Sequence, residues 1–137
     1  MTVMESVTNW LKGYEGLKGR LNVDALDDEA GSYSVDAVPC EAVINRYLDG
    51  SSIRQFQFSV ASRRFYDQNI AQNLDNLRFF EDLTAWAEKA PLPVMDAGKT
   101  ARKVVVTSSA YPFTVADNGT ARYQIQMRLE YYQEGER

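Results

Sequence analysis

Hydrophobic residues recur at three- and four-residue spacing in two segments, which predicts two amphipathic helices. The first covers residues 1–18 and is expected to fray near its two glycines, because glycine is costly inside a helix. The second covers residues 68–89, with Asp67 as a candidate N-cap and prolines just beyond its end. The apolar stripe of this second helix consists of Ile70, Leu74, Leu77, Phe80, Leu83 and Trp86, with Ala87 on the same edge.

Elsewhere apolar and polar residues alternate, which predicts strands. An Asp49-Gly50-Ser51 turn joins two of them into a hairpin, and an Asn118-Gly119 turn precedes the last one. Residues 21–30 are ambiguous, because a short strand is possible at their start and the acidic run that follows indicates a loop. The other expected strands lie at residues 32–38, 41–48, 52–61, 103–109, 111–115 and 121–132, with a loop at 92–100.

The last strand has the most regular pattern in the chain. Tyr123, Ile125, Met127, Leu129 and Tyr131 all fall on one face. At about 3.3 Å per residue this strand would span roughly 40 Å, which is long for so small a domain. We therefore expect its end to reach past the body of the protein and to pair or pack with something else.

The element order is helix, strands, long helix, strands. Hairpin-joined strands give an antiparallel sheet, and amphipathic helices must cover one of its faces. The sequence therefore predicts an α+β fold, with the N-terminal helix and the long central helix packed on an antiparallel β-sheet. Residues 1–137 are expected to form a single domain, since they show no internal repeat or low-complexity tract.

Composition narrows the functional classes. The net charge of −4 and the pI of about 4.8 argue against nucleic acid as a direct partner, because phosphate binding needs a basic patch. The single cysteine, Cys40, excludes an internal disulfide and favours a reducing compartment. No secretory signal and no apolar run of membrane-spanning length is visible. We expect a soluble protein of the cytoplasm that makes no membrane contact.

The sequence contains no histidine, which removes the commonest general base and metal ligand. Cys40 has no cationic neighbour in sequence that would activate it, and a small packed thiol is favoured over a reactive one. The acidic residues between Asp24 and Glu29 do not follow calcium-loop spacing, so a solvated loop is favoured over an ion site. The sequence predicts no catalytic residue, metal or cofactor, and hence a protein that is not an enzyme.

Aromatic and arginine side chains are instead grouped as they are at interface hot spots. For the first of three groups, the alternative to an interface is inward packing at the start of the helix, and for the second group it is an ordinary edge strand. For the last pair, the interface would be an extension of the sheet between subunits. The candidate interface residues are Arg63, Arg64, Phe65 and Tyr66, then Tyr111 and Phe113, and finally Tyr131 and Tyr132.

Four segments, taken in order, resemble a known family. They are SYSVDAVP at 32–39, QFQFS at 55–59, RFYDQN at 64–69 and RYQIQM at 122–127. Together they are similar to the small tail-terminator or minor capsid proteins of siphophages and prophages of Gram-positive bacteria, over residues 32–135. None of the four is a catalytic signature.

The resemblance implies a structural protein of the virion, made in the host cytoplasm and located at the head–tail junction. It implies a homo-hexameric ring that caps the tail tube and docks to the head-completion protein of the connector, with DNA only as passing cargo. A head-completion or stopper protein of the same connector is the first alternative. A monomeric binding protein with no role in the phage particle is the second.

Overall fold

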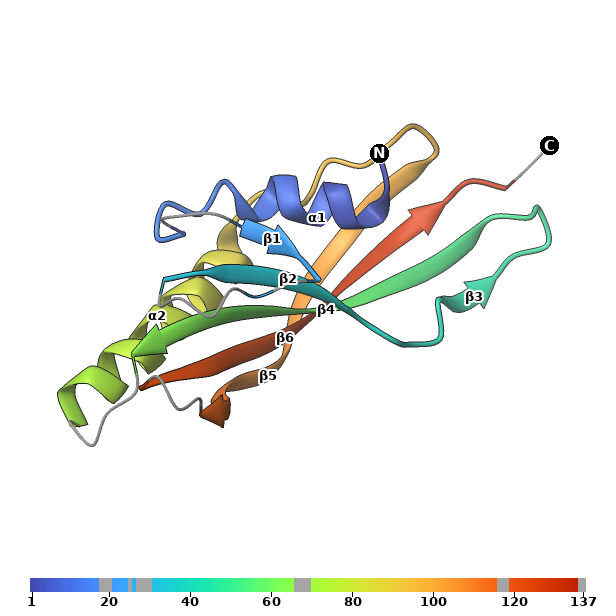
Figure 1. Ribbon diagram of the computed structural model, residues 1–137. Helices are drawn as coiled ribbons and strands as arrows, with labels where there is room; N and C mark the ends of the chain where they lie inside the picture. The colour runs from blue at the N-terminus through green and yellow to red at the C-terminus, as the bar shows by residue number, and fades with distance from the viewer. Residues whose placement is uncertain (18–20, 25, 27–30, 66–69, 116–118, 136–137) are drawn as a thin grey trace.

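The computed structural model describes residues 1–17, 21–24, 26, 31–65, 70–115 and 119–135, and the side chains of 70–72, 111 and 113–115 are not described. Two helices and six strands are found in this part of the chain (Figure 1). In chain order they are α1 (Val3–Leu11), β1 (Leu21–Val23), β2 (Tyr33–Val38), β3 (Val43–Arg46), β4 (Ser52–Phe65), α2 (Ile70–Lys89), β5 (Lys99–Val115) and β6 (Thr120–Gln133).

All six strands form one sheet, five of them in the order β1-β2-β4-β6-β5, and β3 pairs with β4 outside this order. One edge of β4 pairs with β6 over the whole length of β4, and the other edge is shared by β3 and β2 in succession. These pairs and β5–β6 are antiparallel, whereas β1 pairs with β2 in parallel. The α+β class with a largely antiparallel sheet is therefore confirmed, and the short first strand is the parallel exception.

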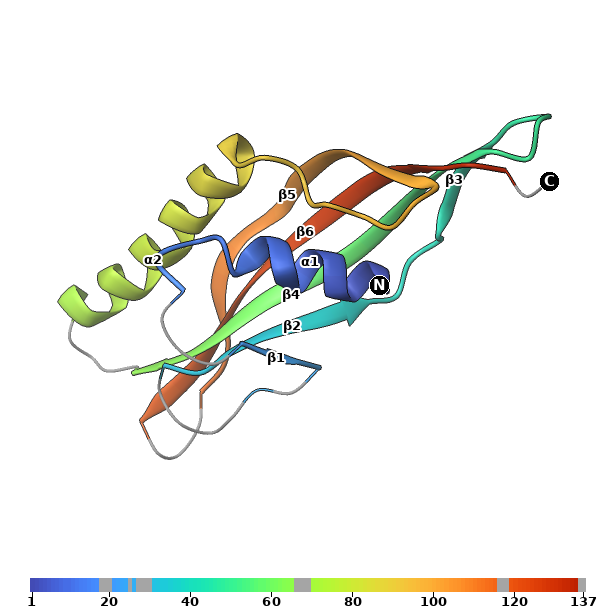
Figure 2. The ribbon, with the colours of Figure 1, turned by 90° about the horizontal axis from the view of Figure 1, so that it is seen from above.

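Both helices lie on the same face of the sheet, as Figures 1 and 2 show. The register of β4 against β6 places Phe58 beside Met127 and Val60 beside Ile125, and all four side chains are buried. Successive side chains of a strand point to opposite faces of the sheet, so the residues between these in both strands point to the other face. The predicted inward set on the last strand is confirmed, since its five members are all buried.

Helix α1 is shorter than predicted. Thr2 caps it, because its Oγ1 accepts a hydrogen bond from the Glu5 N–H at 3.1 Å, a capping arrangement visible in the sequence. The helix ends at Leu11, where two glycines in the next five residues make continuation unfavourable. Val7, Trp10 and Leu11 on its inner side belong to the core.

Helix α2 begins at Ile70, and the predicted N-cap, Asp67, lies outside the described residues. The predicted apolar stripe is correct at Phe80 and Leu83 but wrong at Leu74, whose side chain is 54% exposed. Asn76 is fully buried near that end instead. Its amide donates to the Phe65 carbonyl at 2.7 Å, which satisfies a polar group that burial would otherwise penalise.

Strand β5 is one continuous element where the sequence suggested a loop and two strands. It begins at Lys99, before the expected start, and runs through Pro112. Four register shifts against β6 absorb extra residues as bulges. Pro112 is tolerated because β5 is an edge strand, and proline's missing N–H leaves no ladder bond unmade there.

Strand β6 covers the predicted residues and one more at each end, but both of its neighbours are strands of the same chain. It lies between β4 and β5, and Gln133 at its end is still paired with both Ser52 and Lys99. The expectation that its excess length pairs with another molecule is therefore wrong for the described strand. The length is used instead to extend the sheet beyond the two helices.

Candidate functional site: a projecting arm and two grooves

The sheet continues past the helical layer as a projecting hairpin, which we call the arm. It comprises residues 43–54, formed by β3, a turn and the first three residues of β4. In Figures 1 and 2 this hairpin extends away from α2, beyond the end of α1. The arm is supported along one side by β6, through the pairing of Ser52 with Gln133 and of Arg54 with Tyr131.

The turn at the tip of the arm is well defined. The Asp49 carboxylate accepts hydrogen bonds from the N–H of Ser51 at 2.9 Å and from its hydroxyl at 2.5 Å. Gly50 has φ of 89°, a conformation that favours glycine. Gly135 lies so close that an added Cβ would fall 2.6 Å from the Asp49 carbonyl oxygen. The tip is thus held in place from inside the turn and from the neighbouring chain segment.

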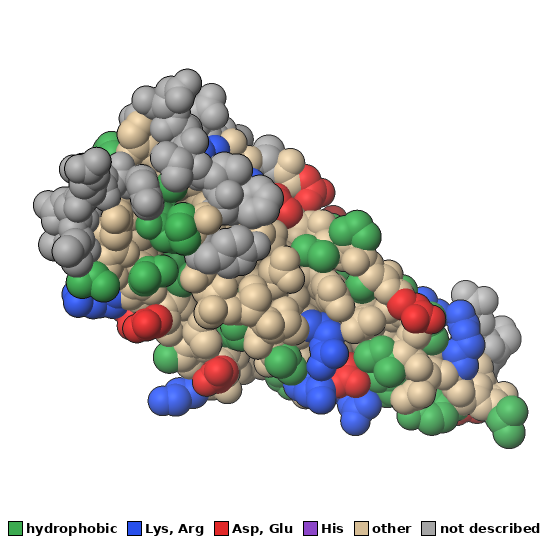
Figure 3. Space-filling model, turned by 90° about the horizontal axis from the view of Figure 1, so that it is seen from below, with side chains coloured by type: hydrophobic (Ala, Val, Ile, Leu, Met, Phe, Trp, Pro, Cys, Tyr) green, Lys and Arg blue, Asp and Glu red, His purple; other side chains and the backbone are tan. Residues whose placement is uncertain are grey.

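Apolar side chains cover this rigid tip. Leu48 is fully exposed, Tyr47 is half exposed, and Ile44 on β3 is exposed as well. Single exposed apolar residues are ordinary, but a group of them on one protrusion indicates a contact surface. In Figure 3 several hydrophobic side chains likewise gather at the narrow end of the molecule. This surface was not predicted from the sequence, although Tyr47-Leu48 directly before the Asp-Gly turn was a usable signal.

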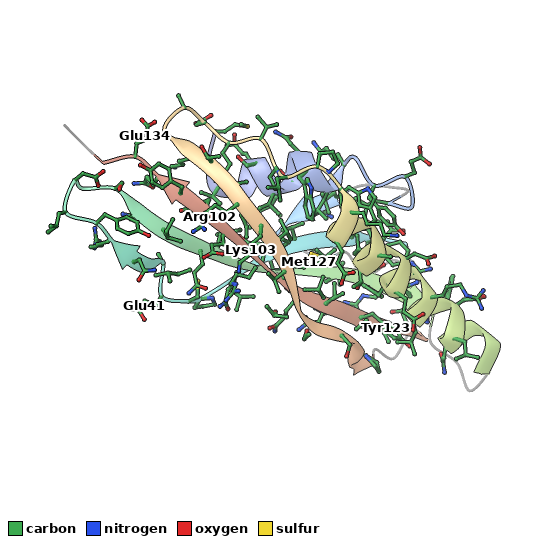
Figure 4. The ribbon with its side chains drawn as sticks, turned by 180° about the vertical axis from the view of Figure 1, so that it is seen from behind. Glu41, Arg102, Lys103, Tyr123, Met127 and Glu134 are labelled. Carbon is green, nitrogen blue, oxygen red and sulfur yellow. The ribbon has the colours of Figure 1, made fainter. Side chains whose placement is uncertain are left out.

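The face of the sheet opposite the helices is polar. It carries Gln55, Gln57, Gln126 and Arg128 along the paired strands β4 and β6, together with Ser59 and Gln124, which are buried. Arg122 forms an ion pair with Asp36 across this face, and Lys103 Nζ lies 3.3 Å from Glu130 Oε2. In Figure 3 the charged side chains on the described part of this side are scattered, and Figure 4 shows Lys103 on β5 next to Arg102. Such a face suits wet contacts better than a dry interface.

The residues of the first predicted interface group, 63–66, do not share one surface in the structure. Arg64 makes contacts within the chain: its Nε donates to Asn76 Oδ1 at 3.1 Å, and its guanidinium lies 4.7 Å from the centre of the Phe79 ring. Arg63 lies on the opposite face across from Arg122, and Phe65 is 61% exposed. Tyr66 lies outside the described residues. Phe65 is therefore the described member of this group whose exposed side chain is best placed to contact another molecule.

The other candidate residues are also separated. Tyr111 and Phe113 are on the edge strand β5, and their side chains are not described. Tyr131 is almost fully buried in the core, and Tyr132 is partly exposed on the other face. Because both edges of β6 are occupied, this pair cannot add a strand from another subunit. Contacts through the side chain of Tyr132 stay a prediction.

Burial raises the pKa of the Tyr131 hydroxyl above its ordinary value of 10.0, although nearby Arg54 acts in the other direction. The unfolded chain therefore ionises this tyrosine first. The stability that comes from keeping this hydroxyl protonated is fully present below about pH 10, and it is lost as the pH rises through the folded-state pKa. Tyr131→Phe should lessen the fall in the free energy of unfolding between about pH 8 and pH 10.5. Urea titrations at the two pH values measure this, and an unchanged difference would contradict it.

The structure also places Cys40 and the first residue of the acidic segment. Cys40 is exposed rather than packed, because it lies in the bend between β2 and β3, outside the core. The Asp24 carboxylate accepts a hydrogen bond from the Ala37 N–H at 3.1 Å, so it secures β2. The remaining acidic residues of that segment, 27–29, lie outside the described residues.

Two grooves flank α2. One, of about 500 Å³, lies between α2 and β5 and is lined by Glu81 and Glu88 together with Val106 and Ala110. The second, which we call the tryptophan groove, has a volume of about 420 Å³ and lies between α1 and the segment that follows α2. Its main lining side chains are Trp10, Trp86, Ala90, Leu92, Pro93 and Val94.

Among the described residues, no group of three or more cysteine, aspartate and glutamate side chains is placed to hold a metal ion. Neither helix of the described chain is long and apolar enough to cross a membrane. No family model matches the sequence, and comparison with curated proteins gives no significant match. The features that stand out are therefore geometric: an arm with an apolar tip, a polar sheet face, and two grooves beside α2.

Proposed function

We propose that this protein is the tail terminator of a siphophage or prophage, a structural protein that forms a ring on the end of the tail tube. The projecting arm carries the proposal, because its rigid apolar tip is a surface suited to burial against another subunit. The ring would cover the growing edge of the tube and so end its polymerisation. The chemistry required is adhesive and steric, and no reactive group takes part.

Three further features support this proposal. Of the four segments that resemble terminator proteins, three fall on β2, β4 and β6, and the fourth begins in the last two residues of β4, so their described parts belong to the sheet. The net charge of −4 suits a ring through which DNA passes without adhering. A closed ring of identical subunits requires two different complementary surfaces on each subunit, and the chain has an arm and grooves to offer.

Deletion of the gene from its phage tests the proposal. Overlong tails, restored to normal length when the gene is supplied in trans, are the expected result, because nothing then ends tube growth. Normal tails that never join heads would overturn the terminator role in favour of a head-completion protein. Normal infectious particles would support a binding protein outside the virion. Tail length in negatively stained lysates is the measurement.

A further inference from the structure

The groove between α2 and β5 combines an apolar floor with an acidic rim. We propose that it binds a short segment of a partner protein that carries two lysine or arginine side chains about 10 Å apart, with apolar residues between them. This inference goes beyond the proposed function, because it concerns a single chain and holds whether or not copies of that chain form a ring. The volume of the groove, about 500 Å³, lies in the range of pockets that enclose organic groups, roughly 300–1,000 Å³.

One wall of the groove is a single side of α2. Its lining residues follow one another at intervals of four, three and four, so they form one row along the helix: Leu77, Glu81, Thr84 and Glu88. The two carboxylates are seven residues apart, which is about 10 Å along the axis at roughly 1.5 Å per residue. Between them, the Thr84 hydroxyl donates to the Phe80 carbonyl at 2.9 Å. This wall therefore offers a partner two carboxylate acceptors and no free side-chain donor.

The opposite wall belongs to β5, the edge strand of the sheet, against which α2 packs (Figure 2). Val106 and Ala110 on this wall and Leu77 on the helix are half-buried, and Phe80 below them is buried. Their side chains leave an apolar floor between the two walls. The methylene stem of a lysine or arginine can lie on such a floor while its charged end stays at the wet rim.

The carboxylates of the rim have no cation of their own. Neither Glu81 nor Glu88 forms an ion pair in the part of the chain that the structure describes, and no described lysine or arginine lines the groove. Two cations lie near them on the helix. Arg78 is paired with Asp75 at 3.4 Å, and Lys89, one position after Glu88, is turned about 100° away from the row. A cationic occupant is therefore favoured over a neutral or acidic one.

Titration with a short peptide tests the chemistry of the site. The probe is a fluorescently labelled Lys-Val-Leu-Lys peptide, whose lysines lie about 10 Å apart when it is extended. The matched probe, Glu-Val-Leu-Glu, differs only in charge. Fluorescence anisotropy should show at least tenfold tighter binding of the basic peptide to the full chain, and this affinity should fall as salt is added. Equal binding of both peptides, or no binding of the basic peptide at hundreds of micromolar protein, would overturn the inference.

Removal of charge locates the site. Glu81→Gln combined with Glu88→Gln should weaken binding of the basic peptide at least tenfold and leave the fold intact, because both side chains are exposed. The matched control combines Asp82→Asn, on the side of α2 that faces Tyr14, with Glu15→Gln. It removes the same total charge outside the groove and should leave binding unchanged. Equal losses in the two double variants would assign the effect to net charge and overturn the site.

Competition with spermidine distinguishes a protein segment from a free polyamine, since spermidine carries amines but no apolar side chain. Displacing the labelled peptide should take at least tenfold more spermidine than unlabelled peptide, and equal potency would overturn a protein segment as the occupant. The inference and the proposed function fail separately. Peptide binding by a protein whose deletion leaves tails normal would support the groove without the terminator role. Overlong tails from a protein that binds no basic peptide would refute the groove and leave that role standing.

Discussion

Phe58→Ala is expected to lower the free energy of unfolding by about 3–5 kcal/mol, the largest stability effect of any single change considered for this chain. Phe58 is fully buried at the centre of β4, paired with Met127 on one side and Ala37 on the other. Its ring also lies 5.9 Å from that of Phe56. A domain of this size has roughly 5–15 kcal/mol of stability, so the variant should be marginal or unfolded.

Urea unfolding followed by tryptophan fluorescence measures this cost. Leu77→Ala serves as a graded comparison, because Leu77 is only partly buried and also lines the groove beside β5. Its cost should be clearly smaller than that of Phe58→Ala, although Leu77 belongs to the apolar stripe that the sequence predicts for the helix. Leu74→Ala on the exposed side of α2 should change stability by less than about 0.5 kcal/mol. A Phe58→Ala cost below 1 kcal/mol would contradict the packing described.

Leu48→Asp is expected to have the largest effect on assembly, weakening self-association at least tenfold, which corresponds to about 1.4 kcal/mol. The substitution places a carboxylate at the apolar tip, where burial against a partner would remove it from water. Stability of the single chain should be unchanged, because Leu48 is fully exposed and makes no core contact. Sedimentation velocity across a concentration series measures the loss.

The matched control is Leu74→Asp, which introduces the same charge at another exposed leucine, on α2 and outside both the arm and the tryptophan groove. Its self-association should match that of the unaltered protein. If both variants weaken association equally, net charge rather than the arm determines the effect. If neither does, the tip of the arm is not a subunit contact.

Much of the fold follows from local patterns. The inward residues of β6, the Asp-Gly hairpin and the length of α2 depend on period and turn chemistry, which are properties of neighbouring residues. The continuity of β5 could not be predicted, because its bulges and Pro112 are tolerated only at a sheet edge, and strand order is a tertiary property. The burial of Asn76 and the exposure of Leu74 similarly depend on where α2 meets the end of β4.

The candidate site was harder to predict. Arg64 and Tyr131 are of residue types that are common at interfaces. Arg64 nevertheless packs on Phe79, and Tyr131 lies in the core. Aromatic and arginine side chains serve both purposes, so residue type alone does not separate them. Leu48 is the opposite case. Nothing in the local sequence distinguishes this leucine from one in the core, and it is exposed because it lies on the arm, which no helix covers.

The mass of the purified protein at tens of micromolar shows whether copies of this chain assemble through complementary surfaces. We expect a concentration-dependent species that reaches six times the 15.5 kDa mass of the chain and is lost in the Leu48→Asp variant. A protein that remains a 15.5 kDa monomer throughout, in native mass spectrometry and in sedimentation alike, would contradict it.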